Sequence, residues 1–370
     1  MKTFAQRALS SGAAAALLVG CGGSQPPIGA PGFASRTGTA VHYVYVTNGR
    51  HHDVSAYAVN ASSGALTKLQ RFPAGSKPVG EAIDPTGAFM YVADAESNDV
   101  SAYVLNAKNG DLKYVQGEPF TAGSSPWQVA IDPTGKFVYV ANMDSNDVSA
   151  YAINASSGGL TQVQGSPFAA GSEPSGVAID PTGKFAYVPN NRDNDVSAYA
   201  INASTGALTQ VNGSPFAAGA APRKVAINGT FAYVANYGSD NVSAYAINTE
   251  SGALAQVQGS PYVAGSNPIG VATDPTGAFV YVINHGSDNV SAFAIDASSG
   301  ALTQVKGSPF AAGFGPTAVA IDPTGEFAYV ANIGNPGSLS AYAINSSSGA
   351  LKHVQGSPFA AGHPFDVVVR

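Results

Sequence analysis

Apolar residues recur along this chain with a long period, and a Tyr-Val pair marks each repeat. The pair begins at seven positions spaced 46 to 48 residues apart, namely Tyr45, Tyr91, Tyr139, Tyr187, Tyr233, Tyr281 and Tyr329. Repeats of this length are typical of propeller blades and of solenoids. Each unit holds four short apolar runs separated by Pro, Gly, Asn and Asp, and such runs predict β-strands. No apolar period of 3.6 extends over a helix length, so the repeats are predicted to be all-β.

The pattern within a strand indicates how the sheets pack. In the run from Val196 to Asn202, one face carries Val and two Ala, whereas the other carries Ser, Tyr and Ile. A sheet with one wet face would alternate apolar and charged residues, but here both faces are uncharged, one with small and one with large side chains. Such sheets suit face-to-face stacking around an axis. Seven units of four strands therefore predict a seven-bladed β-propeller with four antiparallel strands per blade.

The chain ends predict how the ring closes. The first unit lacks the inner Val-Ala-Ile-Asp strand and opens at residues 42–46, whereas residues 365–370 form one extra inner strand. We therefore expect the seventh blade to pair one C-terminal strand with three N-terminal strands, which leaves no open end.

The repeat phrases resemble those of a known family. The run Tyr45-Val46-Thr47-Asn48, and the Tyr-Val-Ala-Asn version at Tyr139, resemble the YVTN-repeat β-propellers. The longer phrase Asp-Pro-Thr-Gly-x-Phe-x-Tyr-Val-x-Asn is similar to that of the seven-bladed lactonases, which include 6-phosphogluconolactonase and carboxymuconate cyclase. The resemblance covers residues 41–370. It implies the propeller fold and, as an activity, hydrolysis of a lactone ring.

The N-terminus reads as an export signal with a lipid anchor. Lys2 and Arg7 form a basic start, and the apolar run from Ala13 to Val19 is too short to span a bilayer. The run ends in Leu-Val-Gly-Cys21, which resembles the bacterial lipobox, and Cys21 is the single cysteine. We therefore predict a lipoprotein signal peptide at 1–20, a lipidated Cys21 with a flexible tether at 21–40, and the propeller at 41–370. The alternative for Cys21 is a free thiol or an intermolecular disulfide.

The net charge of the predicted mature protein limits the classes of partner that it is expected to bind. Loss of residues 1–20 would remove two of the 17 basic residues and no acid, leaving 15 basic and 23 acidic side chains, a net charge of −8. This balance argues against nucleic acid, and the membrane is expected to be reached only through the lipid anchor. Gly22 after the cysteine favours the outer membrane where the host has one. We expect a monomer.

Two groups of turns differ in how much they vary between units. The Asp-Pro-Thr-Gly and Asn-Ala-Ser-Ser-Gly turns are nearly uniform, whereas the loops after Tyr-Val-x-Asn and before the inner strand differ from unit to unit. In an up-and-down blade the two variable loops lie at the same end of the strands. Since loops on a rigid scaffold often carry function, this variable face is predicted to hold the site. Neutral drift in loops is the alternative.

Candidate ligand-binding residues lie where the inner strands begin. Glu81 stands where the six other units have valine, and a buried acid needs a partner or a shifted pKa. Arg223 and Lys224 lie half a ring away from Glu81 and Asp366, so we expect a polarised funnel. Trp127, with Gln128 beside it, could stack on a sugar or another ring. The alternatives are surface ion pairs and a packed aromatic side chain.

The lactonase resemblance extends to one candidate active-site segment. Pro222-Arg223-Lys224 is similar to a Pro-Arg-His segment of lactonases, which implies that Arg223 holds an anionic group while Lys224 or Glu81 transfers a proton. Lysine in place of histidine is a departure from that pattern, because an ordinary lysine is charged near pH 7 and cannot accept a proton.

Histidines of the closing blade suggest a metal site. His51 and His52 lie in one variable loop, and His363 and Asp366 join them through the C-terminal strand. Three imidazoles and a carboxylate suit zinc or another divalent transition metal, although adjacent loop histidines are more often solvated. No other cofactor is expected.

The sequence leaves two possible functions open. The uniform blades favour a non-enzymatic scaffold that binds a cell-envelope protein or carbohydrate on the variable face. The alternative is a lactonase-like hydrolase acting on a small anionic lactone, with Arg223, Lys224 and Glu81 as its site.

Overall fold

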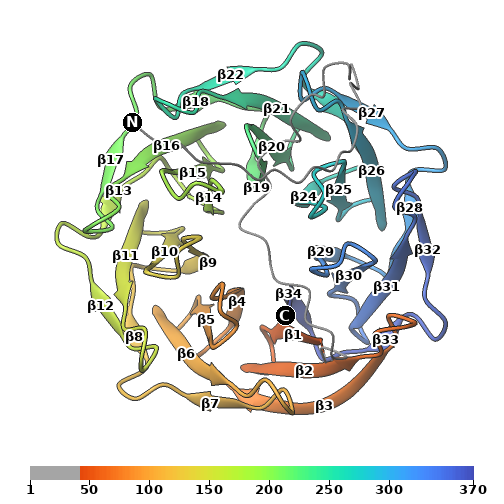
Figure 1. Ribbon diagram of the computed structural model, residues 1–370, viewed down its shortest axis with the longest axis horizontal. Coiled ribbons are helices and arrows are strands. Elements are labelled where there is room, and N and C mark those ends of the chain that lie inside the picture. The colour runs from red at the N-terminus through yellow and green to blue at the C-terminus, as the bar shows by residue number, and fades with distance from the viewer. Residues whose placement is uncertain (1–41) are drawn as a thin grey trace, which may run out of the picture. The chain divides into compact units, whose positions relative to one another are not determined.

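The computed structural model describes residues 42–370, which form seven β-sheets around a central axis (Figure 1). The predicted all-β, seven-bladed propeller is confirmed. The signal peptide, Cys21 and the tether predicted for residues 1–40 lie outside the described residues. Among residues 42–370, no helix is long and apolar enough to cross a bilayer.

Each blade is built outward from the axis. The innermost strands are β4 (Pro78–Ile83), β9 (Pro126–Ile131), β14 (Ala178–Ile179), β19 (Pro222–Asn228), β24 (Pro268–Thr273), β29 (Pro316–Ile321) and β34 (Pro364–Val369). The second strands are β1 (Tyr43–Asn48), β5 (Phe89–Asp94), β10 (Phe137–Asn142), β15 (Phe185–Asn190), β20 (Phe231–Asn236), β25 (Phe279–Asn284) and β30 (Phe327–Asn332). The third strands are β2 (Asp53–Val59), β6 (Asp99–Leu105), β11 (Asp147–Ile153), β16 (Asp195–Ile201), β21 (Asn241–Ile247), β26 (Asn289–Ile295) and β31 (Ser338–Ile344).

The outermost strand is continuous in one blade and divided in six. It is β3 (Leu66–Pro73) in the closing blade. Elsewhere it is the pair β7 (Leu112–Tyr114) and β8 (Phe120–Thr121), β12 (Leu160–Gln162) and β13 (Phe168–Ala169), β17 (Leu208–Gln210) and β18 (Phe216–Ala217), β22 (Leu254–Gln256) and β23 (Tyr262–Val263), β27 (Leu302–Gln304) and β28 (Phe310–Ala311), or β32 (Leu351–His353) and β33 (Phe359–Ala360).

A Gly-Ser-Pro turn causes the division in five of these blades. In one blade the Ser166 hydroxyl accepts a hydrogen bond from the Ala150 amide at 2.9 Å, in place of a strand carbonyl. Gly165 supplies the positive φ of 90° that the turn needs. The closing blade has Leu-Gln-Arg-Phe at this place and keeps a continuous strand.

The ring closes as the chain ends predict. β34 pairs antiparallel with β1, with Val367 opposite Val46, and the sheet order is β3-β2-β1-β34. In Figure 1 the last strand, in blue, lies beside the first strands, in red and orange.

Adjacent blades pack large side chains against small ones, as the strand pattern indicates. Val196 and Ala198 of β16 share a core with Tyr245 of the next blade, whereas Tyr199 of β16 packs with Val148 and other residues of the preceding blade. Each of the seven cores thus lies between two sheets.

A hydrogen bond from a buried tyrosine joins each blade to the next. The tyrosine of each second strand donates to a glycine carbonyl in a turn of the next blade, as from Tyr91 to Gly158 at 2.8 Å. Gly158 has a φ of +77°, and an added Cβ would lie 2.3 Å from the Phe89 ring. The other six bonds are Tyr45–Gly110, Tyr139–Gly206, Tyr187–Gly252, Tyr233–Gly300, Tyr281–Gly349 and Tyr329–Gly64.

One blade departs from a second repeated contact. In the blade of β10, Asn142 donates to Asp147 at 2.6 Å and to Ser149 at 2.9 Å. In the blade of β5 this asparagine is Asp94, whose Oδ2 accepts from Ser101 while its fully buried Oδ1 has no partner. Burial, together with the charge of Asp99, raises the pKa of Asp94 to about 7, although the Ser101 hydrogen bonds oppose the shift.

We expect Asp94→Asn to stabilise the protein at alkaline pH, because the amide would restore the missing donor. The folded-state pKa of Asp94 lies above the unfolded value of about 3.9, so ionisation costs stability that grows as the pH rises from about 4 toward 7. Thermal unfolding should therefore show a larger gain for the variant at pH 8 than at pH 5. The matched change Asn142→Asp should lower the melting temperature, and this loss should be larger at pH 8 than at pH 5. Equal gains at both pH values would contradict this account.

Deletion of residues 365–370 should lower the free energy of unfolding by about 3 kcal/mol or more, because the closing blade would lose its inner strand and the buried Val367. Denaturant unfolding of the truncated chain measures the effect. Removal of Arg370 alone is the control, since it leaves the Val367–Val46 pairing in place. An unchanged unfolding midpoint for the six-residue deletion would show that closure does not hold the ring.

Candidate functional site

A cavity of about 190 Å³ lies among the inner strands. Each inner strand is the edge strand of its own sheet, so its second edge is free of sheet partners and faces the axis. Valine and glycine supply most of the wall, and the polar side chains come from β4, β9, β19 and β34. The lining residues are Glu81, Gln128, Gly176, Val177, Lys224, Val225, Gly270, Val271, Val319, Asp366, Val367 and Val368.

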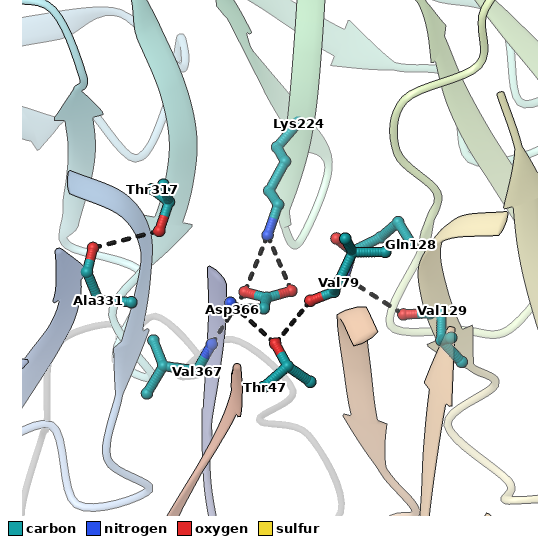
Figure 2. Close-up of polar contacts among 9 residues, drawn as sticks. All are labelled: Thr47, Val79, Gln128, Val129, Lys224, Thr317, Ala331, Asp366 and Val367. Carbon is teal, nitrogen blue, oxygen red and sulfur yellow. Dashed lines mark hydrogen bonds and ion pairs between the residues drawn. The ribbon is translucent and has the colours of Figure 1, made fainter. Parts of the chain in front are cut away.

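An ion pair crosses this cavity. Lys224 extends from β19 to Asp366 on β34, and its Nζ lies 3.0 Å from both carboxylate oxygens (Figure 2). The Lys224 side chain is 22% exposed and that of Asp366 is 7% exposed. The polarised funnel expected from the sequence is therefore wrong. The strands do lie half a ring apart, but the lysine side chain is long enough to bring the two charges together.

Backbone and hydroxyl groups hold Asp366 in place. Its Oδ1 accepts from the Val367 amide at 3.0 Å, while its own amide donates to the Thr47 hydroxyl at 3.0 Å. That hydroxyl donates in turn to the Val79 carbonyl at 2.8 Å (Figure 2). Sequence reasoning missed Thr47. The signal was present, because Tyr-Val-Thr-Asn occurs once and four of the other units have alanine at this position.

Glu81 is the most unusual group in the cavity. It is 2% exposed, and neither of its carboxylate oxygens has a hydrogen-bond partner. Burial, reinforced by the negative charge of Asp366, raises the pKa of Glu81 well above its usual value, and the nearby Lys224 ammonium offsets this only in part. The backbone groups of Thr47 and Val368 lie near and favour the ionised form weakly. Burial therefore favours the protonated form of Glu81, which lies beside a carboxylate and an ammonium group.

The inner strand two blades along the ring from Glu81, β14, is the shortest of the seven. β14 has only two residues because Pro189 on β15 has no amide hydrogen to donate to it. Ser175 instead bonds through its hydroxyl to the carbonyls of Pro222 and Arg223, both at 2.9 Å. Gly176 beside it lies so close that an added Cβ would be 2.8 Å from the Arg223 carbonyl oxygen. This close approach fixes the start of β19, the strand that carries Lys224.

Arg223 does not line the cavity, although it adjoins Lys224. Its guanidinium carbon lies 5.2 Å from the centre of the Tyr237 ring. The Asn191 side chain, with its oxygen toward Arg223, accepts from Nε at 2.9 Å and donates to Glu173 at 3.3 Å. Burial lowers the pKa of Arg223, and Tyr237 and Glu173 oppose this shift. The structure therefore separates the predicted catalytic pair.

The two predicted ligand-binding residues on β9 also point to different places. Gln128 lines the cavity. Trp127 packs edge-to-face on Phe365, with ring centres 5.3 Å apart, and is not among the lining residues. Trp127 is on β9 and Phe365 is on β34, and the inner strand between β9 and β34 is β4 (Figure 1).

The predicted histidine site is not assembled. Within residues 42–370, no group of three or more His, Cys, Asp or Glu side chains is placed to hold a metal ion. His51 and His363 are neighbours, and burial together with Arg50 and His51 lowers the pKa of His363. The His52 Nδ1 instead accepts from the Lys77 amide at 2.9 Å, and Asp366 is held by Lys224 inside the cavity.

The sequence matches one family model along the propeller. The model describes a seven-bladed β-propeller lactonase and matches residues 36–123, 116–172, 165–272 and 264–369. The chain belongs to the seven-bladed β-propeller lactonase family. A search of curated proteins found no match to this lactonase-family chain.

Solved structures share the fold at low sequence identity. A candidate 6-phosphogluconolactonase from Bacteroides fragilis has a TM-score of 0.79 and 20% identity, over 90% of this chain and 99% of that one. The periplasmic gluconolactonase of Pseudomonas aeruginosa has a TM-score of 0.75 and 21% identity, over 89% and 99%. Hydrazine synthase of Kuenenia stuttgartiensis has a TM-score of 0.60 and 20% identity, over 85% and 92%. Family membership favours the hydrolase over the scaffold, which the sequence alone had placed first.

Replacement of Glu81 by the valine of the other six blades should stabilise this lactonase-family protein. A buried polar group without a partner costs about 1–3 kcal/mol, so Glu81→Val should raise the free energy of unfolding by about this amount. Because the folded-state pKa of Glu81 lies above its unfolded value, the gain should grow as the pH rises above about 4.3. Denaturant unfolding at pH 5 and pH 8 measures it. Glu81→Gln keeps a polar group of equal size and should gain less; a destabilised Glu81→Val would show that the carboxyl has a partner.

Proposed function

We propose that this protein hydrolyses lactones in the axial cavity, with Glu81, Lys224 and Asp366 as the reacting groups. The observation that carries the proposal is Glu81, a carboxyl group that is 2% exposed, lacks any hydrogen-bond partner and lines the cavity of a lactonase-family propeller. Such a group costs stability, and perturbed carboxyl groups in clefts are often functional.

The three groups supply the proton transfers that hydrolysis needs. Water adds to the lactone carbonyl carbon and gives a proton to the Asp366 carboxylate, while the Lys224 ammonium stabilises the negative charge on the carbonyl oxygen. The ring carbon–oxygen bond then breaks, and protonated Glu81 gives its proton to the departing oxygen. A proton returns from Asp366 to Glu81 through solvent, and the product is the open hydroxy acid.

Neighbouring residues are proposed to position these groups and the ligand. Thr47 orients Asp366 through its hydroxyl, and Gln128 is placed in the wall to hydrogen-bond a ligand hydroxyl. Arg223 is assigned a positioning role, because its contacts with Tyr237 and Asn191 hold the start of β19. Trp127 is assigned a structural role, because it packs on Phe365, the residue that precedes Asp366 on β34.

We further propose that the enzyme works in the bacterial envelope, exported by residues 1–20 and anchored through lipid on Cys21. The lipobox-like run before Cys21 supports this proposal. Replacement of Cys21 by serine should release the protein from the membrane fraction.

The test is hydrolysis of a panel of neutral, phosphorylated and carboxylated lactones, measured through the acid that ring opening releases. Removal of a general acid typically costs about 10²–10⁴-fold in rate, so Glu81→Gln should lower kcat by about 10²-fold or more. Lys224→Met should also lose activity, because it removes the cation. Lys184→Met, which changes an exposed lysine in a uniform turn, should leave the rate unchanged. Inactivity of the wild-type protein on every lactone would overturn the proposal and favour a binding scaffold.

A further inference from the structure

The charges that face the cavity are balanced. Lys224 is the one cation among the lining residues, and both oxygens of Asp366 lie 3.0 Å from its Nζ. Glu81 adds a neutral acid or a negative charge, never a positive one. The rest of the wall is valine, glycine and Gln128. A ligand in this cavity therefore meets a site with a net charge of zero or below.

Arg223, the second cation near the cavity, already has interaction partners. Arg223 adjoins Lys224 in sequence, but its guanidinium lies over the Tyr237 ring at 5.2 Å, and its Nε donates to Asn191 at 2.9 Å. Glu173, which accepts from the same Asn191 side chain, supplies a compensating negative charge. Neither cation that the sequence offers for an anionic group is thus left without a partner.

We propose that the cavity binds an uncharged lactone and rejects lactones that carry a phosphate or carboxylate group; this inference rests on the proposed function. A phosphate ester carries a charge of about −1.5 to −2 at pH 7 and is bound by arginine or lysine side chains that can pair with it. Here it would have to compete with Asp366 for Lys224 and would lie near Glu81. The site thus differs from the sequence-based expectation of a small anionic lactone, in which Arg223 holds the anionic group.

Asp366 is then the residue that sets this preference. Its carboxylate neutralises Lys224 from a fixed position, because the Thr47 hydroxyl and the Val367 amide hold it. Asp366→Asn keeps the size of the side chain and removes the charge, so Lys224 would become available to an anion. A new cation on the wall, as in Gln128→Lys, should have the same effect without any change to the ion pair.

Binding of stable lactams tests the proposal without need of turnover. We would measure by calorimetry the affinity of the full-length protein for a neutral six-membered polyhydroxy lactam and for the same lactam with a 6-phosphate. The wild-type protein should bind the neutral lactam at least about tenfold more tightly. Asp366→Asn and Gln128→Lys should each shift the ratio of the two affinities by about tenfold or more toward the phosphorylated lactam, and circular dichroism would check that both variants are folded.

The outcomes separate this inference from the proposed function. Tighter wild-type binding of the phosphorylated lactam would overturn the inference, even if neutral lactones are hydrolysed. Preferred binding of the neutral lactam without hydrolysis of any lactone in the panel would support the inference and overturn the proposed function. Failure to bind either lactam would overturn the inference, while the hydrolysis assay would still decide the proposed function. Folded variants whose affinity ratios equal that of the wild type would show that the charge balance does not set the preference.

Discussion

The tyrosine–glycine hydrogen bonds between blades are the contact on which the rest of this structure depends. A buried tyrosine on each second strand donates to a turn carbonyl of the next blade, and the seventh bond, from Tyr329 to Gly64, joins the end of the repeat array to its beginning. The same interfaces hold the seven hydrophobic cores. Because each blade buries its faces only against its two neighbours, no blade is complete without the closed ring.

This closed ring allows the axis to hold groups that a single sheet could not. Glu81 lacks any hydrogen-bond partner, and the Lys224–Asp366 ion pair joins strands half a ring apart. A buried ion pair and a buried acid add little or nothing to stability by themselves, so the interblade packing has to offset their cost. The cavity is thus a place where stability has been given up, which is a common feature of functional sites.

The departures from the repeat identify the site more clearly than the repeat itself. Thr47, Glu81, Lys224 and Asp366 all stand where most other blades have alanine, valine or glycine. Glu81, Lys224 and Asp366 line one cavity, and the Thr47 hydroxyl holds Asp366 (Figure 2). The rule has an exception, since Asp94 also departs from its repeat but does not line the cavity. Since propellers of this shape also occur in hydrazine synthase, the fold alone does not give the chemistry, and the proposed chemistry rests on the charges at the axis.

The sequence by itself determined the blade number, the strand order, the large-against-small packing and the closing strand, because these follow from local apolar pattern and turn chemistry repeated seven times. It also marked Glu81 as an acid among valines. Only the tertiary structure decided which charges meet. Adjacent Arg223 and Lys224 leave their strand toward different surroundings, and Lys224 crosses the axis to Asp366. The length and direction of a side chain across a cavity depend on the placement of strands far apart in the chain, and no local pattern records that placement.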